Sequence, residues 1–175
     1  MSGVSVATGA EDGGYAGRRS REVATMTTQQ ERPMSSEENK AIARRLMEEY
    51  FTKGDEATWD ELVQPDVVVH DVTGDLRGAA EAKAFYARLR AAFPDLSGVI
   101  EDIFGEGDKV ALRITETGTM RESFMGMEPT GKSFTLTAMQ ICRFSGGKLA
   151  EMWGARDTGS QLRQLGVAPP PAQPQ

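Results

Sequence analysis

The stretch that decides the fold runs from Ser145 to Gly166 and reads SGGKLAEMWGARDTGSQLRQLG. Its first four residues are typical of a tight turn, because glycine reaches positive φ without a steric penalty. Lys148 to Trp153 then fits a short strand. Asp157 stands where a helix N-cap belongs, since a short oxygen side chain accepts hydrogen bonds from free backbone N–H groups, and Gly166 suits the end of that helix. The stretch therefore predicts a strand, a helix and, at their junction, an aspartate that either caps the helix or reaches a cavity.

Before this stretch, the second half of the chain predicts three more strands. They cover residues 96–106, 110–121 and 133–144. In the middle strand, polar residues such as Arg113 alternate with Leu112, Ile114 and Glu116, as expected of a strand whose two faces differ. The segment FMGMEPTGK (124–132) is rich in turn residues and predicts a loop.

The first half of the folded region has helical periodicity instead. The predicted helices cover 36–53, 55–63 and 79–93, with a strand at 67–70 and a loop at 74–78. Three helices followed by an antiparallel sheet with short turns indicate an α+β fold. Helices that cross one face of a curved sheet would enclose a cone-shaped cavity, so we expect a cone-shaped α+β barrel with a pocket.

The two ends of the chain differ from this pattern. Residues 1–33 contain few large apolar side chains, and their four acids are balanced by four arginines. We interpret them as a disordered, dispensable extension, with Met34 as a possible start. We assign residues 34–166 to one domain and 167–175, which are proline-rich, to a flexible tail.

Composition limits the possible functions. A net charge of −6 argues against nucleic acid or an anionic membrane as a partner. The chain has one histidine, His70, and one cysteine, Cys142, which are too few for a zinc site of histidine and cysteine. It has no phosphate-binding glycine motif, no G-x-S-x-G elbow and no apolar run long enough to span a membrane. We therefore expect no metal, no cofactor and a cytoplasmic location.

The motifs, taken in order, resemble a known family. They are NKAIARRLMEEYFTKGD, QPDVVVHD, AAFPDLSGVIEDIFGEGDKVALRITETGT, FMGMEPTGK and GGKLAEMWGARDTGSQLRQLG, which together extend from Asn39 to Gly166. This pattern resembles the SnoaL-like polyketide cyclases of the nuclear-transport-factor-2-like superfold. The resemblance implies an α+β cone, a homodimer or higher oligomer, and cofactor-independent ring closure on a small hydrophobic or polyketide-like substrate.

The resemblance also implies site residues. The family's acid/base aspartate corresponds to Asp157. Tyr50 and Phe85 match positions that shape the substrate pocket. Gln140 and Met152 stand where characterised cyclases can carry histidine, and both departures weaken the case for aldol chemistry in particular.

Other residues have two interpretations each. His70 either polarises a substrate carbonyl or is structural. Arg113 either binds an acidic group or forms an ion pair with Glu116 or Asp157. Phe124 and Trp153 complete the predicted substrate-binding set, although Trp153 also fits the core.

Three functions are compatible with this set: an aldol-type cyclase, an epoxide hydrolase or epoxide-opening cyclase, and a non-catalytic binding module. We expect the cyclase, because intramolecular closure on an acidic methylene needs one carboxylate, Asp157, with help from His70. Hydrolysis of an epoxide needs two well-placed titratable groups, and Gln140 and Met152 replace two of the candidates.

Overall fold

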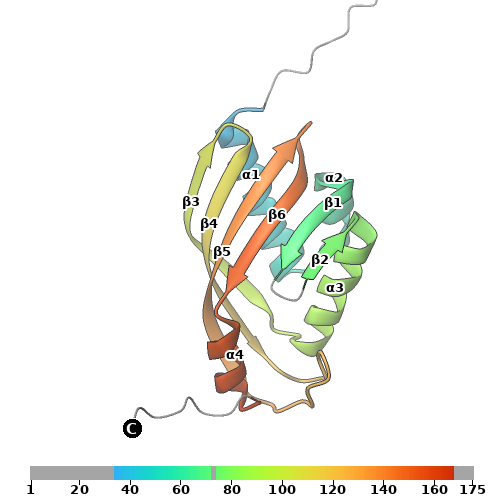
Figure 1. The fold of residues 1–175 in the computed structure, drawn as a ribbon, viewed down its shortest axis with the longest axis vertical. Coiled ribbons are helices and arrows are strands. Elements are labelled where there is room, and N and C mark those ends of the chain that lie inside the picture. Colours follow the sequence, from blue (N-terminus) through green and yellow to red (C-terminus); the bar gives the residue numbers. More distant parts are fainter. Residues whose placement is uncertain (1–33, 72–73, 168–175) are drawn as a thin grey trace, which may run out of the picture. The chain divides into compact units, whose positions relative to one another are not determined.

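The computed structural model describes residues 34–71 and 74–167 (Figure 1). The predicted N-terminal extension, 1–33, and residues 168–175 of the predicted tail lie outside the described residues. The proposed domain boundaries therefore remain predictions.

The first predicted helix is present and has two parts. α1 (Ser36–Arg45) continues directly into η1 (Leu46–Thr52), a π-helical segment. Its N-cap is Ser35, one residue before the predicted start: the Ser35 hydroxyl accepts from the Glu38 N–H at 3.2 Å, and the Glu38 carboxylate accepts from the Ser35 N–H at 2.7 Å. This reciprocal capping box fixes where the helix begins. π-Helical segments often occur at functional sites. η1 contains Tyr50, which is buried.

The other two predicted helices are α2 (Glu56–Leu62) and α3 (Ala79–Ala92), but the segment between them differs from the prediction. The strand β1 (Val63–Asp71) is longer than expected, and the predicted loop at 74–78 is mostly a strand, β2 (Gly74–Arg77), antiparallel to β1. Pro65 is tolerated inside β1 because the pairing register shifts between Val63 and Val68, where a missing N–H breaks no ladder bond.

Six strands form one sheet in the order β2-β1-β6-β5-β4-β3. The remaining four are β3 (Ser97–Glu106), β4 (Lys109–Thr119), β5 (Ser133–Ser145) and β6 (Lys148–Arg156). All neighbours are antiparallel except β1 and β6, which run parallel. The predicted α+β class is confirmed. The sheet is mixed and does not close, because β2 and β3 are edge strands.

The two faces of the sheet have different surroundings. Alternate residues of β4 and β5, such as Leu112, Ile114, Leu136 and Ala138, are buried on the face covered by the helices (Figure 1). The short helix α4 (Thr158–Leu165) follows β6, with Asp157 as its N-cap and Gly166 as a left-handed C-cap, as predicted. Within the described residues, no helix combines the length and apolar character needed to cross a bilayer.

Candidate functional site

A cavity that contains predicted site residues lies beside α4. We call it the aromatic pocket; it measures about 250 Å³. Phe85 and Phe93 of α3 and Phe124, Met125 and Met127 of the loop before β5 line it, together with Leu162 and Leu165 of α4. Its polar lining residues are Asp71, Arg156, Thr158 and Gln161. An apolar pocket with a few convergent polar groups is the usual form of a small-molecule site.

A buried charged cluster borders this pocket. Arg156 at the end of β6 donates from Nη2 to Oδ2 of Asp71 at the end of β1, at 3.3 Å. Its Nη1 lies 3.9 Å from Oε2 of Glu116 on β4. The side chains of Arg156, Asp71 and Glu116 are 13%, 8% and 1% exposed. Two carboxyl groups therefore flank one guanidinium where water is largely excluded.

Burial changes the acid–base properties of this cluster. Desolvation raises the pKa of Glu116, and the positive charge of Arg156 offsets part of that effect. Oε1 of Glu116 has no hydrogen-bond partner among the described residues. A neutral Glu116 is therefore favoured to a higher pH than an ordinary glutamate. Next to the cluster, burial also raises the pKa of Tyr86.

None of these three residues was predicted to be a site residue, although the sequence contains two signals for them. Glu116 falls among Leu112 and Ile114 in the alternation of β4, so a charged residue was predicted on the apolar face. Asp71 alternates in the same way with Val67 and Val69, both buried. Arg156 was missed because the strand was predicted to end at Trp153, whereas β6 continues to Arg156.

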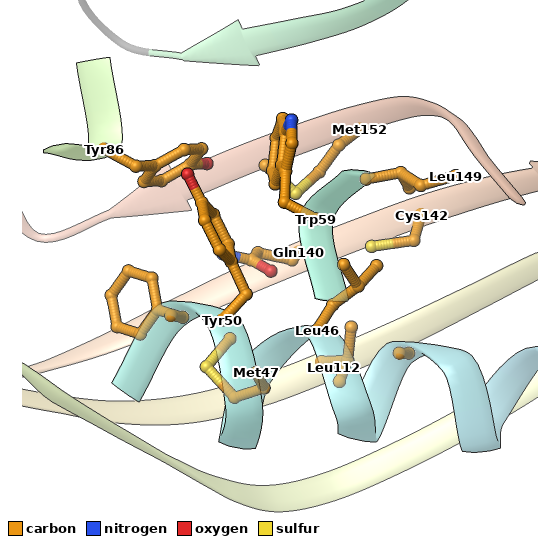
Figure 2. Close-up of a pocket in the computed structure, with 12 residues that line it drawn as sticks. Leu46, Met47, Tyr50, Trp59, Tyr86, Leu112, Gln140, Cys142, Leu149 and Met152 are labelled. Atoms are coloured by element: carbon orange, nitrogen blue, oxygen red, sulfur yellow. The ribbon is translucent and has the colours of Figure 1, made fainter. Parts of the chain in front are cut away.

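A smaller cavity, which we call the Tyr50 cavity, measures about 40 Å³. It brings together three predicted substrate-binding residues, Tyr50, Gln140 and Met152, with Trp59 and Tyr86 (Figure 2). The hydroxyl of Tyr50 and Nε1 of Trp59 are buried and have no hydrogen-bond partner among the described residues. Phe85 and Phe124 line the aromatic pocket instead, so the predicted set is divided between the two cavities.

Asp157 occupies its predicted place at the start of α4 and caps the helix. Its Oδ1 accepts from the Ser160 N–H at 2.8 Å. The residue is exposed and lines neither of the two cavities, whereas its neighbours Arg156 and Thr158 both line the aromatic pocket. The capping interpretation is confirmed, and the catalytic one stays a prediction.

His70 and Trp153 lie on the opposite face of the sheet, away from the helices. The two rings stack with centroids 5.4 Å apart. His70 Nε2 lies 3.0 Å from Glu151 Oε1, and its Nδ1 lies 2.8 Å from Asp75 Oδ1. Hydrogen bonds to these carboxylates raise the pKa of His70. The expectation that Trp153 belongs to the core is wrong: Met152 points inward, so the alternation of β6 turns Trp153 outward, where it is 36% exposed.

Arg113 also lies on this outer face. Its Nε donates to Asp102 Oδ2 at 2.6 Å. The structural ion pair is present, but the predicted partners were wrong, because Arg113 and Glu116 alternate to opposite faces of β4. Among the described residues, no group of three or more His, Cys, Asp or Glu side chains is placed to hold a metal ion.

Known proteins resemble this chain in sequence and in structure. Residues 41–165 match the family model of the SnoaL-like polyketide cyclases. A search of curated proteins found no match. A proposed SnoaL-like polyketide cyclase from Jannaschia sp. CCS1 is similar in structure, with 26% identity, a TM-score of 0.72 and coverage of 81% of this chain and 99% of the other.

Two Streptomyces proteins are also similar. IdmH from Streptomyces antibioticus, a proposed polyketide cyclase, has 32% identity and a TM-score of 0.64 over 74% of this chain and 99% of its own. AclR from Streptomyces galilaeus, a proposed hydroxylase, has 30% identity and a TM-score of 0.68 over 77% of this chain and 100% of its own. The family model covers most of the chain, and these similarities extend over nearly the full length of each relative, so the chain belongs to the SnoaL-like polyketide cyclase family.

Proposed function

We propose that this protein is a cofactor-independent cyclase that closes a ring on a polyketide-type intermediate by acid–base catalysis. The observation that carries the proposal is the buried cluster of Asp71, Arg156 and Glu116 beside the aromatic pocket. Phenylalanine side chains suit the flat, apolar part of such an intermediate, and the family to which the chain belongs supports the reaction class.

The proposed chemistry uses the two groups of the cluster that face the pocket. Asp71 takes a proton from a methylene between two carbonyl groups, and the resulting enolate carbon attacks a second carbonyl carbon of the same molecule. Arg156 stabilises the negative oxygen that develops. The alkoxide formed at the attacked carbonyl then takes the proton back from Asp71. Thr158, whose Oγ1 is buried without a partner among the described residues, is placed to donate to a ligand oxygen.

Glu116 does not line the pocket, so we propose a positioning role for it. Its Oε2 lies 3.9 Å from Nη1 of Arg156 and so helps to hold the guanidinium in place. Arg156 Nη2 is then directed to Asp71 and toward the ligand.

The assignment of acid–base work to Asp157, with help from His70, stays a separate prediction. It requires the Asp157 carboxylate to give up its hydrogen bond with the Ser160 N–H and to rotate into the aromatic pocket when the substrate binds. The geometry favours Asp71, which already lines the pocket. For His70 the geometry offers no comparable support, because its ring lies on the other face of the sheet.

One observation favours a second function, the hydrolytic opening of an epoxide. The cyclase was preferred from the sequence because a second titratable group was missing. The cluster contains two carboxyl groups around Arg156, so one could deprotonate a water molecule while another group protonates the epoxide oxygen.

The experiment that tests these functions is turnover of a reconstituted poly-β-keto intermediate in ¹⁸O-labelled water, with an enzyme-free control for carbonyl exchange. Ring closure predicts a new carbon–carbon bond and no solvent oxygen in it. A non-exchangeable ¹⁸O in the product would assign the hydrolase. Tight binding without turnover by the wild type would assign a binding module.

We also propose that two copies pair through the outer face of the sheet. Large apolar side chains are exposed there, namely Val99, Phe104, Met139, Ile141 and Trp153. Exposed apolar side chains on one face favour a protein partner, and a homodimer agrees with the sequence prediction. Ile141→Glu should convert the dimer to a monomer in light scattering. Met125→Glu, which adds the same charge at an exposed position outside the sheet, is the matched control.

We also propose that the protein acts in the cytoplasm. Cys142 is a free, buried thiol, and the described fold contains no disulfide that an oxidising compartment would have to supply. Fractionation of the native cells would test this location.

A further inference from the structure

The Tyr50 cavity contains two hydrogen-bonding groups that the protein itself leaves unused. Tyr50 Oη and Trp59 Nε1 are completely buried, and neither has a partner among the described residues. Buried polar groups in folded proteins are almost always hydrogen-bonded, and the exceptions commonly mark a site for water or a ligand. Two unpaired groups on one small cavity therefore call for a common explanation.

The two residues come from different elements, and both line this cavity. Tyr50 is on η1 and Trp59 on α2, and their ring centroids are 4.5 Å apart. Figure 2 shows Tyr50 reaching across the cavity with its hydroxyl directed toward Tyr86. The Arg90 guanidinium lies over the face of the Tyr50 ring, 4.6 Å from its centroid, and its Nη1 donates to the backbone oxygen of Tyr50 at 3.4 Å. No group of the described residues lies within hydrogen-bonding geometry of the Tyr50 hydroxyl.

The size of the cavity limits what can enter. One water molecule needs about 10–15 Å³ of such space, whereas a cavity of about 150 Å³ accommodates benzene. At about 40 Å³ the Tyr50 cavity has room for a small group and no room for an aromatic ring. Most of its lining is apolar, including Met47, Leu149 and Met152, so few positions exist at which an occupant can be hydrogen-bonded.

The chemistry of the two groups limits the occupant further. An indole N–H can only donate, and a tyrosine hydroxyl can donate and accept. The occupant must therefore accept a hydrogen bond, which excludes an ammonium group and favours oxygen. We propose that the Tyr50 cavity is an oxygen-binding subsite in which one water, hydroxyl or carbonyl oxygen accepts from both Trp59 Nε1 and Tyr50 Oη. This inference does not depend on the reaction proposed above.

A crystal structure of the wild-type protein at about 1.5 Å resolution or better tests the proposal directly. We expect one density peak within roughly 2.7–3.2 Å of both Tyr50 Oη and Trp59 Nε1. An empty cavity, or an oxygen bound to only one of the two atoms, would overturn the proposal.

Tyr50→Phe supplies an independent test that keeps the ring and removes only the hydroxyl. If the hydroxyl is hydrogen-bonded to an oxygen, the melting temperature should fall by about 2–4 °C. If the cavity is empty, the change removes an unpaired polar group, and the melting temperature should stay constant or rise, which contradicts the proposal. Met152→Leu, which alters an apolar wall of the same cavity, controls for general repacking.

A pair of probes distinguishes the source of the oxygen. Acetone and isobutene have nearly the same shape and contain no ring, but only acetone carries a carbonyl oxygen. If a ligand oxygen replaces the water, the wild type should bind the ketone at least about fivefold more tightly, and Tyr50→Phe should abolish this preference. Equal affinities, with the density peak retained, would identify the occupant as water.

Discussion

Arg156 Nη2 lies 3.3 Å from Asp71 Oδ2, although the two residues are 85 positions apart in the chain. Both side chains are almost fully buried, so solvent screens their attraction much less than that of a surface pair. Removal of one partner would leave the other as a buried, unpaired charge. The pair is therefore at once a candidate catalytic element and a structural one, and the two roles can be separated by measurement.

Asp71→Asn should lower kcat by about 10²–10⁴-fold, because the amide cannot take a proton. It should also lower the free energy of unfolding, since Arg156 loses its counter-charge. Asp102→Asn, which breaks the half-exposed pair with Arg113 on the outer face, should cost less than about 1 kcal/mol and leave kcat unchanged. Steady-state kinetics and urea unfolding of the two variants make the comparison.

Asp157→Asn separates the two proposed acid–base groups. Asparagine caps a helix about as well as aspartate, so the fold should be retained. If Asp71 is the base, kcat of this variant should stay within about threefold of the wild type. An inactive Asp157→Asn beside an active Asp71→Asn would transfer the role to Asp157.

Glu116→Gln should change how stability depends on pH. Because the folded-state pKa of Glu116 is raised above its ordinary value of 4.5, the folded protein binds this proton more tightly than the unfolded chain. This tighter proton binding adds to the free energy of unfolding below pH 4.5, and the added stability is lost as the pH rises toward the folded-state pKa. Relative to Glu116→Gln, the wild type should lose up to about 1.4 kcal/mol per pH unit in that window. Urea unfolding of both proteins at several pH values measures the difference, and parallel curves would contradict the assignment.

His70 should stabilise the fold in its protonated form. Glu151 and Asp75 raise its pKa above 6.5, and these carboxylates also contact Arg143 and Arg77. The stabilisation is complete below pH 6.5 and is lost as the pH rises through the raised pKa. The melting temperature of the wild type, compared with that of His70→Gln, should therefore fall across this range. An NMR titration of the single histidine gives its pKa directly, and a value at or below 6.5 would contradict the prediction.

Met125→Asn should stabilise the protein slightly. Met125 has φ of 52° and Gly126 has φ of 77°, in a two-residue turn closed by hydrogen bonds between Phe124 and Met127. A methionine in this left-handed region is strained, and Asn-Gly is the preferred pair for a hairpin turn with positive φ at both positions. The melting temperature should rise by about 1–3 °C. Met125→Leu, which keeps the strain, should show no rise.

The sequence was sufficient for the elements with strong local signals. The strand–cap–helix order at Asp157 and Gly166 was predictable because capping and left-handed termination depend on neighbouring residues alone. The strand β2 was not, since Gly74–Arg77 has little β propensity and pairs only because β1 is present beside it. The same dependence on distant strands explains the extra length of β1.

The residues of the candidate site also differ in whether they could be predicted from the sequence. Tyr50, Phe85, Gln140 and Met152 were selected through a family resemblance, and they line cavities, as does Phe124. The cluster of Asp71, Glu116 and Arg156 comes from three strands, and no local pattern indicates that such residues meet. Trp153 was wrongly expected in the core for a simpler reason: one residue of difference along a strand moves a side chain to the other face.

The parallel pairing of β1 with β6 has a consequence for how the molecule is made. β1 ends at Asp71, but its partner in the middle of the sheet is complete only at Arg156. During synthesis, β1 therefore cannot pair with β6 until most of the domain has emerged from the ribosome. Until then, one apolar edge of β1 stays exposed. The Asp71–Arg156 pair belongs to the last contacts that can form. A nascent chain that stops before β6 would carry α1, the first hairpins and the phenylalanines of the pocket, yet it would contain no working site.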